Sequence, residues 1–208
     1  MLPVGCRDGH GDKLNIVNAE MNRLLMIVDP QVDFISGTLP VAGAVGAMDA
    51  LGAYIRDNVA GYCRIIVTAD RHPFGHCSFV ANGGTWPRHC VHDSVGAAIW
   101  PPVMNVLCEC PVPVTVLHKG ELAGTEEYSV FQNSECARRI DEMICDHRIE
   151  MIDLCGIAGD VCVAATLRDG IERFGTGLFT VLTRFSPSID GGDALDSLIS
   201  KYELRCDR

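Results

Sequence analysis

The segment "GIAGDVCV" at residues 156–163 places a cysteine directly after a turn of small residues, where an apolar run gives way to a helical pattern. Cys162 is expected in the first turn of a helix that begins near Asp160, where free backbone N–H groups and the helix dipole favour a thiolate. The same N–H groups could hold an oxyanion, because small residues let a substrate approach the backbone closely. Cys162 is therefore either a nucleophile or a buried structural thiol, and its neighbours must decide between the two.

Two charged residues elsewhere in the chain could activate such a thiol. Cysteine hydrolases usually use a histidine as the base, but Asp29 could serve instead if partial burial raises its pKa. Lys119 would then hold the geometry and balance the charge. The alternative is that Asp29 ends a strand as a cap and that Lys119 is a solvated surface lysine.

A third group of residues has the chemistry of a metal site. The stretches "DRHPFGH" (70–76) and "WPRHC" (86–90) supply Asp70, His72 and His89. One carboxylate with two imidazoles suits a divalent transition metal such as zinc, iron or manganese. A rival is a structural zinc site, which is disfavoured by irregular spacing and by "CEC" in place of C-x-x-C. That rival site would use Cys90, His92, Cys108 and Cys110.

Short apolar runs predict the strands that must position these residues. The expected strands are 23–29, 64–70, 114–120, 149–157 and 177–184. Apolar residues at spacings of three and four predict helices between them. The expected helices are 45–59, a short one within 94–107, 135–148, 163–174 and 195–202. Because wholly apolar strands alternate with helices, we expect an α/β fold with a parallel sheet covered on both sides.

The ends of the expected strands carry the residues with chemistry. Strands end at Asp29, at Asp70, at Lys119 and at the glycine turn before Cys162. Ligands of open parallel sheets bind beyond the carboxyl ends of the strands. The loop from Arg71 to about Pro113 is long for a compact domain, and such loops are usually functional. We therefore expect an acid, a pair of metal-ligand candidates, a base and a thiol to converge on the carboxyl edge of the sheet.

Composition narrows the class of protein. The chain has 208 residues, 48% of them hydrophobic, and a formal charge of −10, which fits one globular domain with a sizeable core. No dense Lys/Arg cluster is present, so a nucleic-acid partner is not expected. No stretch reaches the roughly 18 apolar residues of a membrane span, and residues 1–20 lack the apolar central region of a signal peptide. We therefore expect a cytoplasmic protein with no membrane partner.

The cysteines give little support to a disulfide framework. There are 11 of them, an odd number, and they are mixed into apolar runs, so most are expected to be reduced core residues. The domain is expected at 21–208, with 1–20 as an extension of uncertain role and Met21 as an alternative start.

Five blocks of the sequence resemble one known family. They are "IVDPQVDF", "TADRHPFGHCSF", "WPRHCV", "KG" followed by "YSVF", and "GIAGDVCV". Their order and rough spacing resemble nicotinamidases, also called pyrazinamidases, among the isochorismatase-like cysteine hydrolases. The resemblance runs from about Leu24 to Leu198. The WPxHCV block is the most specific, because it separates nicotinamidases from isochorismatases and carbamoyl-sarcosine amidases of the same fold.

The resemblance implies a three-layer α/β/α fold with a central, mainly parallel sheet, and a role for each matched residue. The implied catalytic triad is Asp29, Lys119 and Cys162, and the implied oxyanion hole is the N–H groups of Ala158 and Cys162. The implied ligands of one divalent metal ion, zinc with iron or manganese as alternatives, are Asp70, His72 and His89, with His76 as an additional candidate. The implied walls of the pyridine pocket are Phe34 and Trp86.

The implied activity is hydrolysis of nicotinamide to nicotinate and ammonia through a cysteine thioester, a reaction of NAD salvage. Pyrazinamide is the implied second substrate. The ring nitrogen would bind the metal directly or through water, and the Ile157–Ala158 peptide would be cis. The sequence departs from the family at Gly159, often threonine, and at Val32, often asparagine. Two alternatives to this activity stay open: another amidohydrolase or isochorismatase-like activity, and a non-enzymatic metal-binding or redox protein. Whether the chain assembles into a homo-oligomer also stays open.

Overall fold

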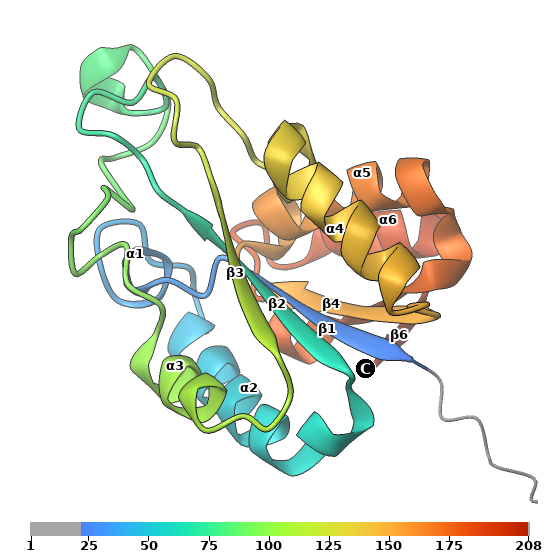
Figure 1. The fold of residues 1–208 in the computed structure, drawn as a ribbon. Coiled ribbons are helices and arrows are strands. Elements are labelled where there is room, and N and C mark those ends of the chain that lie inside the picture. The colour runs from blue at the N-terminus through green and yellow to red at the C-terminus, as the bar shows by residue number, and fades with distance from the viewer. Residues whose placement is uncertain (1–21, 208) are drawn as a thin grey trace, which may run out of the picture.

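The computed structural model describes residues 22–207, so the expected extension at 1–20 lies outside the described residues. Six parallel strands form one sheet in the order β3-β2-β1-β4-β5-β6 (Figure 1). The strands are β1 Arg23–Val28, β2 Arg64–Asp70, β3 Val114–Lys119, β4 Met151–Gly156, β5 Phe179–Leu182 and β6 Arg205–Asp207. The sequence did not predict β6, because this three-residue edge strand, "RCD", has no apolar run.

Helices cover both faces of the sheet, which confirms the three-layer architecture. In Figure 1, α2 and α3 lie on one face, and α4, α5 and α6 lie on the other. The helices are α1 Val32–Ile35, α2 Ala44–Asn58, α3 Pro101–Cys108, α4 Ser134–Asp146, α5 Ala164–Phe174 and α6 Asp193–Lys201. The helix expected within 94–107 begins only at Pro101, because proline suits the first turn of a helix.

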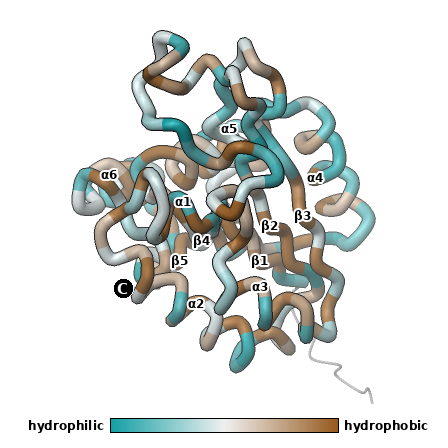
Figure 2. Tube along the Cα trace, turned by 90° about the vertical axis from the view of Figure 1, so that its left-hand side faces the viewer, coloured by the Kyte–Doolittle hydropathy of each residue, from teal (hydrophilic) through white to brown (hydrophobic). Residues whose placement is uncertain are grey.

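The core consists of two apolar layers separated by the sheet. Alternate residues of β1 point to opposite faces, so Leu24 and Met26 belong to one layer while Leu25 and Ile27 belong to the other. Figure 2 shows the brown, hydrophobic strands enclosed by helices that are teal on parts of their outer surface. Burial on both faces explains why these strands are apolar throughout instead of alternating.

The strand order reverses between β1 and β4, which are direct neighbours. Val28 pairs with Gly156 at the carboxyl end of this pair. A β carbon on Gly156 would lie 2.0 Å from the carbonyl oxygen of Val28, so only glycine allows the two strand ends to approach this closely. The chain then leaves β1 through Asp29, whose φ of 46° lies in the left-handed region. Open parallel sheets bind ligands at such a reversal point.

Two long loops lie together beyond the carboxyl ends of β2 and β3 (Figure 1). The N–H of Cys77, in the loop after β2, donates to the carbonyl of Ala123, in the loop after β3, at 2.7 Å. Within the first loop, His72 forms a parallel bridge with Val91. These contacts return the histidine-rich chain to the edge of the sheet at which the strands end.

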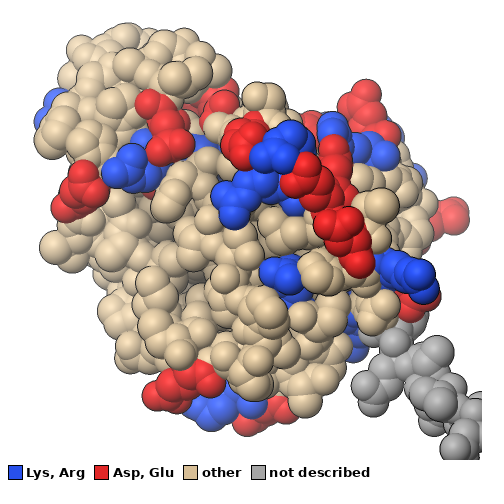
Figure 3. All heavy atoms as spheres, viewed as in Figure 1, with Lys and Arg blue, Asp and Glu red and all other residues tan. Residues whose placement is uncertain are grey.

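None of the helices within residues 22–207 is both long and apolar enough to cross a membrane. On the face shown in Figure 3, acidic and basic side chains alternate over α4. Arg138 of this helix forms ion pairs with Glu135, at 2.6 Å, and with Glu142.

Candidate active site

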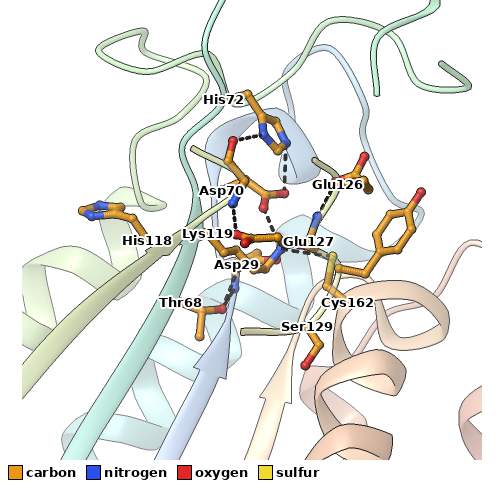
Figure 4. Close-up of polar contacts among 12 residues, drawn as sticks. Asp29, Thr68, Asp70, His72, His118, Lys119, Glu126, Glu127, Ser129 and Cys162 are labelled. Atoms are coloured by element: carbon orange, nitrogen blue, oxygen red, sulfur yellow. Dashed lines mark hydrogen bonds and ion pairs between the residues drawn. The ribbon is translucent and has the colours of Figure 1, made fainter. Parts of the chain in front are cut away.

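The Lys119 ammonium lies at the centre of a buried cluster (Figure 4). Lys119 ends β3 and pairs in register with Asp70, the last residue of β2. Its Nζ lies 2.6 Å from Asp70 Oδ1, 2.9 Å from Asp29 Oδ2 and 3.7 Å from Cys162 Sγ. Nζ also donates to the carbonyl of Glu127 at 3.0 Å. The interpretation of Lys119 as a solvated surface residue is therefore wrong.

The charges in this cluster depend on one another. Burial alone would lower the pKa of Lys119, but the carboxylates of Asp29 and Asp70 raise it well above its usual value, so the ammonium is charged. Burial alone would raise the pKa of Asp70, but the Lys119 ammonium and His72 outweigh burial and lower it. One buried cation thus faces two carboxylates.

Asp29 is the more basic of the two carboxylates. Burial raises the pKa of Asp29, and the opposing effects of Lys119 and the Thr68 hydroxyl do not cancel that rise. Thr68 Oγ1 donates to Asp29 Oδ1 at 2.6 Å and accepts from the Asp29 N–H at 3.2 Å, so the carboxylate has a fixed orientation. A carboxylate oxygen of Asp29 lies within 4.8 Å of Cys162 Sγ. This geometry suits proton transfer between the two side chains.

Cys162 lies in a π-helical turn, Gly159–Val163, that leads into α5. The helix start expected near Asp160 is therefore present, with wider winding than an α-helix. Burial raises the pKa of the Cys162 thiol well above its usual value, although Lys119 opposes this rise. Burial thus opposes the thiolate that the helix start is expected to favour. A neighbouring base is needed to ionise the thiol.

The turn before Cys162 presents backbone donors to the same space. The Ile157–Ala158 peptide is cis, as the family resemblance implied. Within residues 22–207, the N–H of Ala158 makes no hydrogen bond. Ala158 and Cys162 both line one cavity, and an unpaired backbone N–H is the kind of donor that an oxyanion requires.

Asp70, His72 and His89 come together as a candidate metal centre. One ligand atom of each lies within 4.8 Å of the others. His72 Nδ1 bonds the carbonyl of Gly120 at 2.9 Å and His89 Nδ1 bonds that of Pro87 at 2.8 Å, which directs Nε2 of each ring inward. His72 Nε2 is buried and has no hydrogen-bond partner among the described residues. An orphaned imidazole nitrogen beside a carboxylate fits a divalent metal ion.

The protonation states of the His72 and His89 rings also affect whether this site can bind a metal ion. Burial lowers the pKa of His89, so its ring is neutral, the form that binds metal. Burial would likewise lower the pKa of His72, but Asp70 outweighs burial and raises it. His72 Nε2 and Asp70 Oδ2 lie 3.6 Å apart. A cation shared by these two groups would take the place of a proton.

His76 stacks on His72 with ring centroids 4.0 Å apart, but both of its nitrogens are occupied. Nδ1 lies 2.7 Å from Ser78 Oγ and Nε2 lies 3.0 Å from the carbonyl of Thr125. His76 also forms a second candidate group with His72 and Glu126. Glu126 was not singled out in the sequence, because an acid in a loop carries no local signal.

The rival structural zinc site is not formed among the described residues. Its four members do not appear together in any group of ligand atoms close enough to share an ion. Cys90 is instead packed in the core, and its pKa is raised well above the usual value by burial. The ten described cysteines are all free thiols, as their apolar surroundings indicated.

Two side chains that the sequence did not assign hold the metal-centre residues in place. The amide of Gln31 accepts from the Asp70 N–H at 2.8 Å and donates to the Asp70 carbonyl at 2.8 Å. Asp33 Oδ2 accepts from the N–H of Cys90 at 2.7 Å, which fixes the chain directly after His89. Both residues lie in the "IVDPQVDF" block, but their partners are distant in sequence.

The cavity beside Cys162 has aromatic and apolar walls. Together with the solvent space at its open mouth, the cavity holds about 400 Å³ of empty space. Phe34 and Trp86 both line it, as expected, and Trp86 Nε1 donates to the hydroxyl of Tyr128 at 3.1 Å. The other lining residues are Leu39, Val41, Asp70, His89, Glu126, Tyr128, Ala158, Val161, Cys162 and Ile189.

The two departures from the family pattern differ in position. Val32 is half-buried, its N–H donates to the carbonyl of Ala98 at 2.9 Å, and it is not among the residues that line the cavity. Gly159 faces Ser186 and Ser188, and a β carbon there would lie 2.3 Å from Ser188 Oγ. The side chains around Gly159 therefore occupy the space that a larger residue would need.

Comparison with known proteins gives concordant results. The model of the isochorismatase domain matches residues 23–181. The chain is 30% identical over 186 residues to nicotinamidase/pyrazinamidase of Mycobacterium tuberculosis, covering 87% of this chain and 92% of the relative. It is 28% identical over 173 residues to nicotinamidase of Escherichia coli, covering 72% of this chain and 76% of the relative.

A solved structure supports the same relationship. Pyrazinamidase of Pyrococcus horikoshii in complex with zinc superposes with a TM-score of 0.73 at 28% identity, covering 90% of this chain and 99% of that one.

Proposed function

Since this chain belongs to the isochorismatase domain family, we propose that it is a nicotinamidase, which hydrolyses nicotinamide to nicotinate and ammonia. The relatives above that carry this activity in their names match most of the chain. The observation that carries the proposal is a buried Asp29–Lys119–Cys162 cluster at a cavity with aromatic walls. Pyrazinamide, a ring amide of similar shape, is the second expected substrate.

Asp29 acts as the base in this mechanism. Its raised pKa makes it a stronger base than an ordinary aspartate, and it takes the proton of the Cys162 thiol. The sulfur then attacks the amide carbonyl, and the N–H groups of Ala158 and Cys162 hold the resulting oxyanion. Protonated Asp29 gives its proton to the departing ammonia, which leaves a thioester. Asp29 next activates a water molecule, which hydrolyses the thioester to the carboxylic acid.

Lys119 stays charged throughout these steps. Its Nζ is within 3.7 Å of the thiol and 2.9 Å of the base, so it stabilises negative charge on either atom as the proton moves. The contacts of Nζ with Asp70 and with the carbonyl of Glu127 hold the ammonium in place while the proton moves between Cys162 and Asp29. Lys119 therefore orients Asp29 without taking part in proton transfer.

The cavity walls select a flat aromatic amide. Phe34 and Trp86 hold the ring, and the hydroxyl of Tyr128 fixes the indole of Trp86 at 3.1 Å. Flat aromatic rings are bound well by aromatic side chains. This arrangement places the carboxamide next to Cys162 and the oxyanion donors.

Asp70, His72 and His89 would hold one divalent metal ion, with zinc as the proposed ion and His76 or Glu126 as additional neighbours. When bound, that ion would offer a Lewis-acid position for the ring nitrogen of the substrate or for water. Asp70 and His89 also line the cavity, so the ligand set and the substrate share one space. A zinc complex of a related pyrazinamidase supports this choice of ion.

The test is ammonia release from nicotinamide, pyrazinamide and benzamide by the wild-type protein and by Asp29→Asn. We expect nicotinamide and pyrazinamide to be hydrolysed, and Asp29→Asn to lower kcat by at least about 100-fold, as loss of an acid/base group usually does. Nicotinamide binding, measured by calorimetry, should be largely retained in the variant. Near-normal turnover in Asp29→Asn would rule out this residue as the base, and no ammonia from any amide would rule out the function.

A further inference from the structure

The turn that carries Cys162 is tied to a segment from the far end of the chain. We call residues 187–190 the lip segment; it lies between β5 and α6. Asp160 Oδ1 accepts from the N–H of Ile189 at 2.9 Å, and Asp160 Oδ2 accepts from the N–H of Asp190 at 3.0 Å. The N–H of Gly159 donates to the carbonyl of Pro187 at 2.9 Å. Three hydrogen bonds therefore join the lip segment to the two residues before Val161.

Packing reinforces this connection. A β carbon on Gly159 would lie 2.3 Å from Ser188 Oγ and 2.6 Å from the carbonyl oxygen of Ser186. No gap thus separates the lip segment from the turn. Because Asp160 and Cys162 are two residues apart, the position of the lip segment relative to the sulfur is fixed through a short, rigid connection.

One side chain of the lip segment reaches the substrate cavity. Ile189 lines the same cavity as Cys162, although 54% of its surface is exposed. A branched apolar side chain that is half in solvent and half in a cavity wall lies at the mouth of that cavity. The backbone at Ile189 is held by Asp160, whose carboxylate accepts the N–H of Ile189.

We propose that Ile189 is a specificity-determining residue that limits the size of the ring amide, and that Asp160 is the positioning residue that holds it there. The choice of ring amides as the substrate class rests on the proposed function. The geometric part, a side chain that restricts access to Cys162, does not depend on it. Loss of either side chain should open the mouth of the cavity without changing the buried cluster around Lys119.

The first experiment compares kcat/KM for nicotinamide and for quinoline-3-carboxamide, which carries a second fused ring. Ile189→Ala should raise the ratio of the bulky to the small substrate by at least about 10-fold, the discrimination typical of one or two methyl groups in a pocket. Asp160→Ala should raise the ratio in the same direction and increase KM for nicotinamide more than it lowers kcat. Asp160→Asn keeps one acceptor oxygen, so its substrate ratio should lie between those of wild type and Asp160→Ala.

The matched controls alter similar groups that do not line the cavity. Val45→Ala removes an apolar side chain of α2 that is 46% exposed. Asp141→Asn alters a carboxylate that binds Arg173 with two hydrogen bonds between α4 and α5. Both controls should leave the substrate ratio at the wild-type value. Unchanged ratios in Ile189→Ala would overturn the proposal, and substitutions at such half-exposed positions usually change stability little.

The second experiment measures alkylation of Cys162 by iodoacetamide and by the larger N-phenyl iodoacetamide, using peptide mass spectrometry. Ile189→Ala and Asp160→Ala should speed the reaction of the larger reagent relative to the smaller one, while the two controls should not. This readout needs no turnover. If the wild-type protein released no ammonia, the proposed function would fail while the alkylation ratio still tested Ile189. Equal alkylation ratios in all variants would reject the role of Ile189 as a barrier.

Discussion

The ammonium of Lys119 lies 2.9 Å from Oδ2 of Asp29, and neither side chain is exposed to solvent. An ammonium and a carboxylate that are both withdrawn from water are tolerated only because each compensates the charge of the other. The pair therefore sets both the stability of the cluster and the basicity of its carboxylate.

Replacement of the cation should destabilise the protein in a pH-dependent way. Lys119→Met leaves two buried carboxylates without their cation, which should lower the free energy of unfolding at pH 7 by about 3–5 kcal/mol. The pKa values of these carboxylates rise in the folded variant, so the folded state binds more protons than the unfolded state. The deficit should thus be largest at neutral pH and shrink in acid, as measured by urea unfolding at pH 5 and pH 7. Lys201→Met, on α6, should change stability by less than about 0.5 kcal/mol, and a deficit that grows in acid would contradict the prediction.

The hydroxyl of Thr68 should set the acidic limb of the pH profile. Its hydrogen bond of 2.6 Å to Asp29 favours the carboxylate and so lowers the pKa of Asp29 against the effect of burial. Thr68→Val should raise that pKa further and move the acidic limb of kcat/KM to higher pH, because the base must be ionised. Thr166→Val is the matched control, since the buried Thr166 hydroxyl has no partner among the described residues. An acidic limb that stays in place in Thr68→Val would exclude this role.

Two buried cysteines should respond differently to the same substitution. Cys162→Ala should abolish ammonia release while the circular dichroism spectrum and melting temperature stay close to those of the wild type. Cys155→Ala, near the carboxyl end of β4 and also buried, should keep near-normal activity. The physical reason is that Cys162 alone of the two lies within reach of Asp29 and the cavity. Equal loss of activity in both variants would point to packing as the cause.

Gln31 should affect metal affinity without being a ligand. Its amide bonds both the N–H and the carbonyl of Asp70, so Gln31→Met frees the backbone that aims this carboxylate. Loss of such a supporting contact typically weakens metal binding by about 10–100-fold. Competition between the protein and a chromophoric chelator for zinc measures the change directly. The control is Gln132→Met, because the amide oxygen of Gln132 accepts from the N–H of Ser129 instead. Equal zinc affinity of Gln31→Met and wild type would refute the prediction.

Two glycine substitutions should change stability in opposite directions. Gly159→Ala places a β carbon 2.3 Å from Ser188 Oγ, and such overpacking costs about 1–3 kcal/mol. Gly46→Ala, on the exposed side of α2 with no atom within 4 Å of the new carbon, should stabilise the protein by about 0.5–1 kcal/mol. Urea midpoints of the two variants check the signs. A Gly159→Ala variant as stable as wild type would show that the lip segment gives way freely.

The convergence of the candidate site could be predicted from the sequence. The apolar runs ending near Asp29, Asp70 and Lys119, and the run before the glycine turn, identified four strands with chemistry at their carboxyl ends. Parallel strands point the same way, so residues at their ends meet at one edge whatever the lengths of the intervening segments. Family resemblance added roles for the matched positions, and the geometry around them is compatible with those roles.

Other features depended on the tertiary structure. The edge strand β6 exists because β5 offers it a partner, since "RCD" has no local strand pattern. The clamp of Gln31 on Asp70, like the tie of Asp160 to Ile189, joins segments whose loops bring them together, and hydrophobic periodicity carries no information about such loops. The raised pKa of Cys162 likewise follows from burial, which depends on how every surrounding element packs and on no residue near it in sequence.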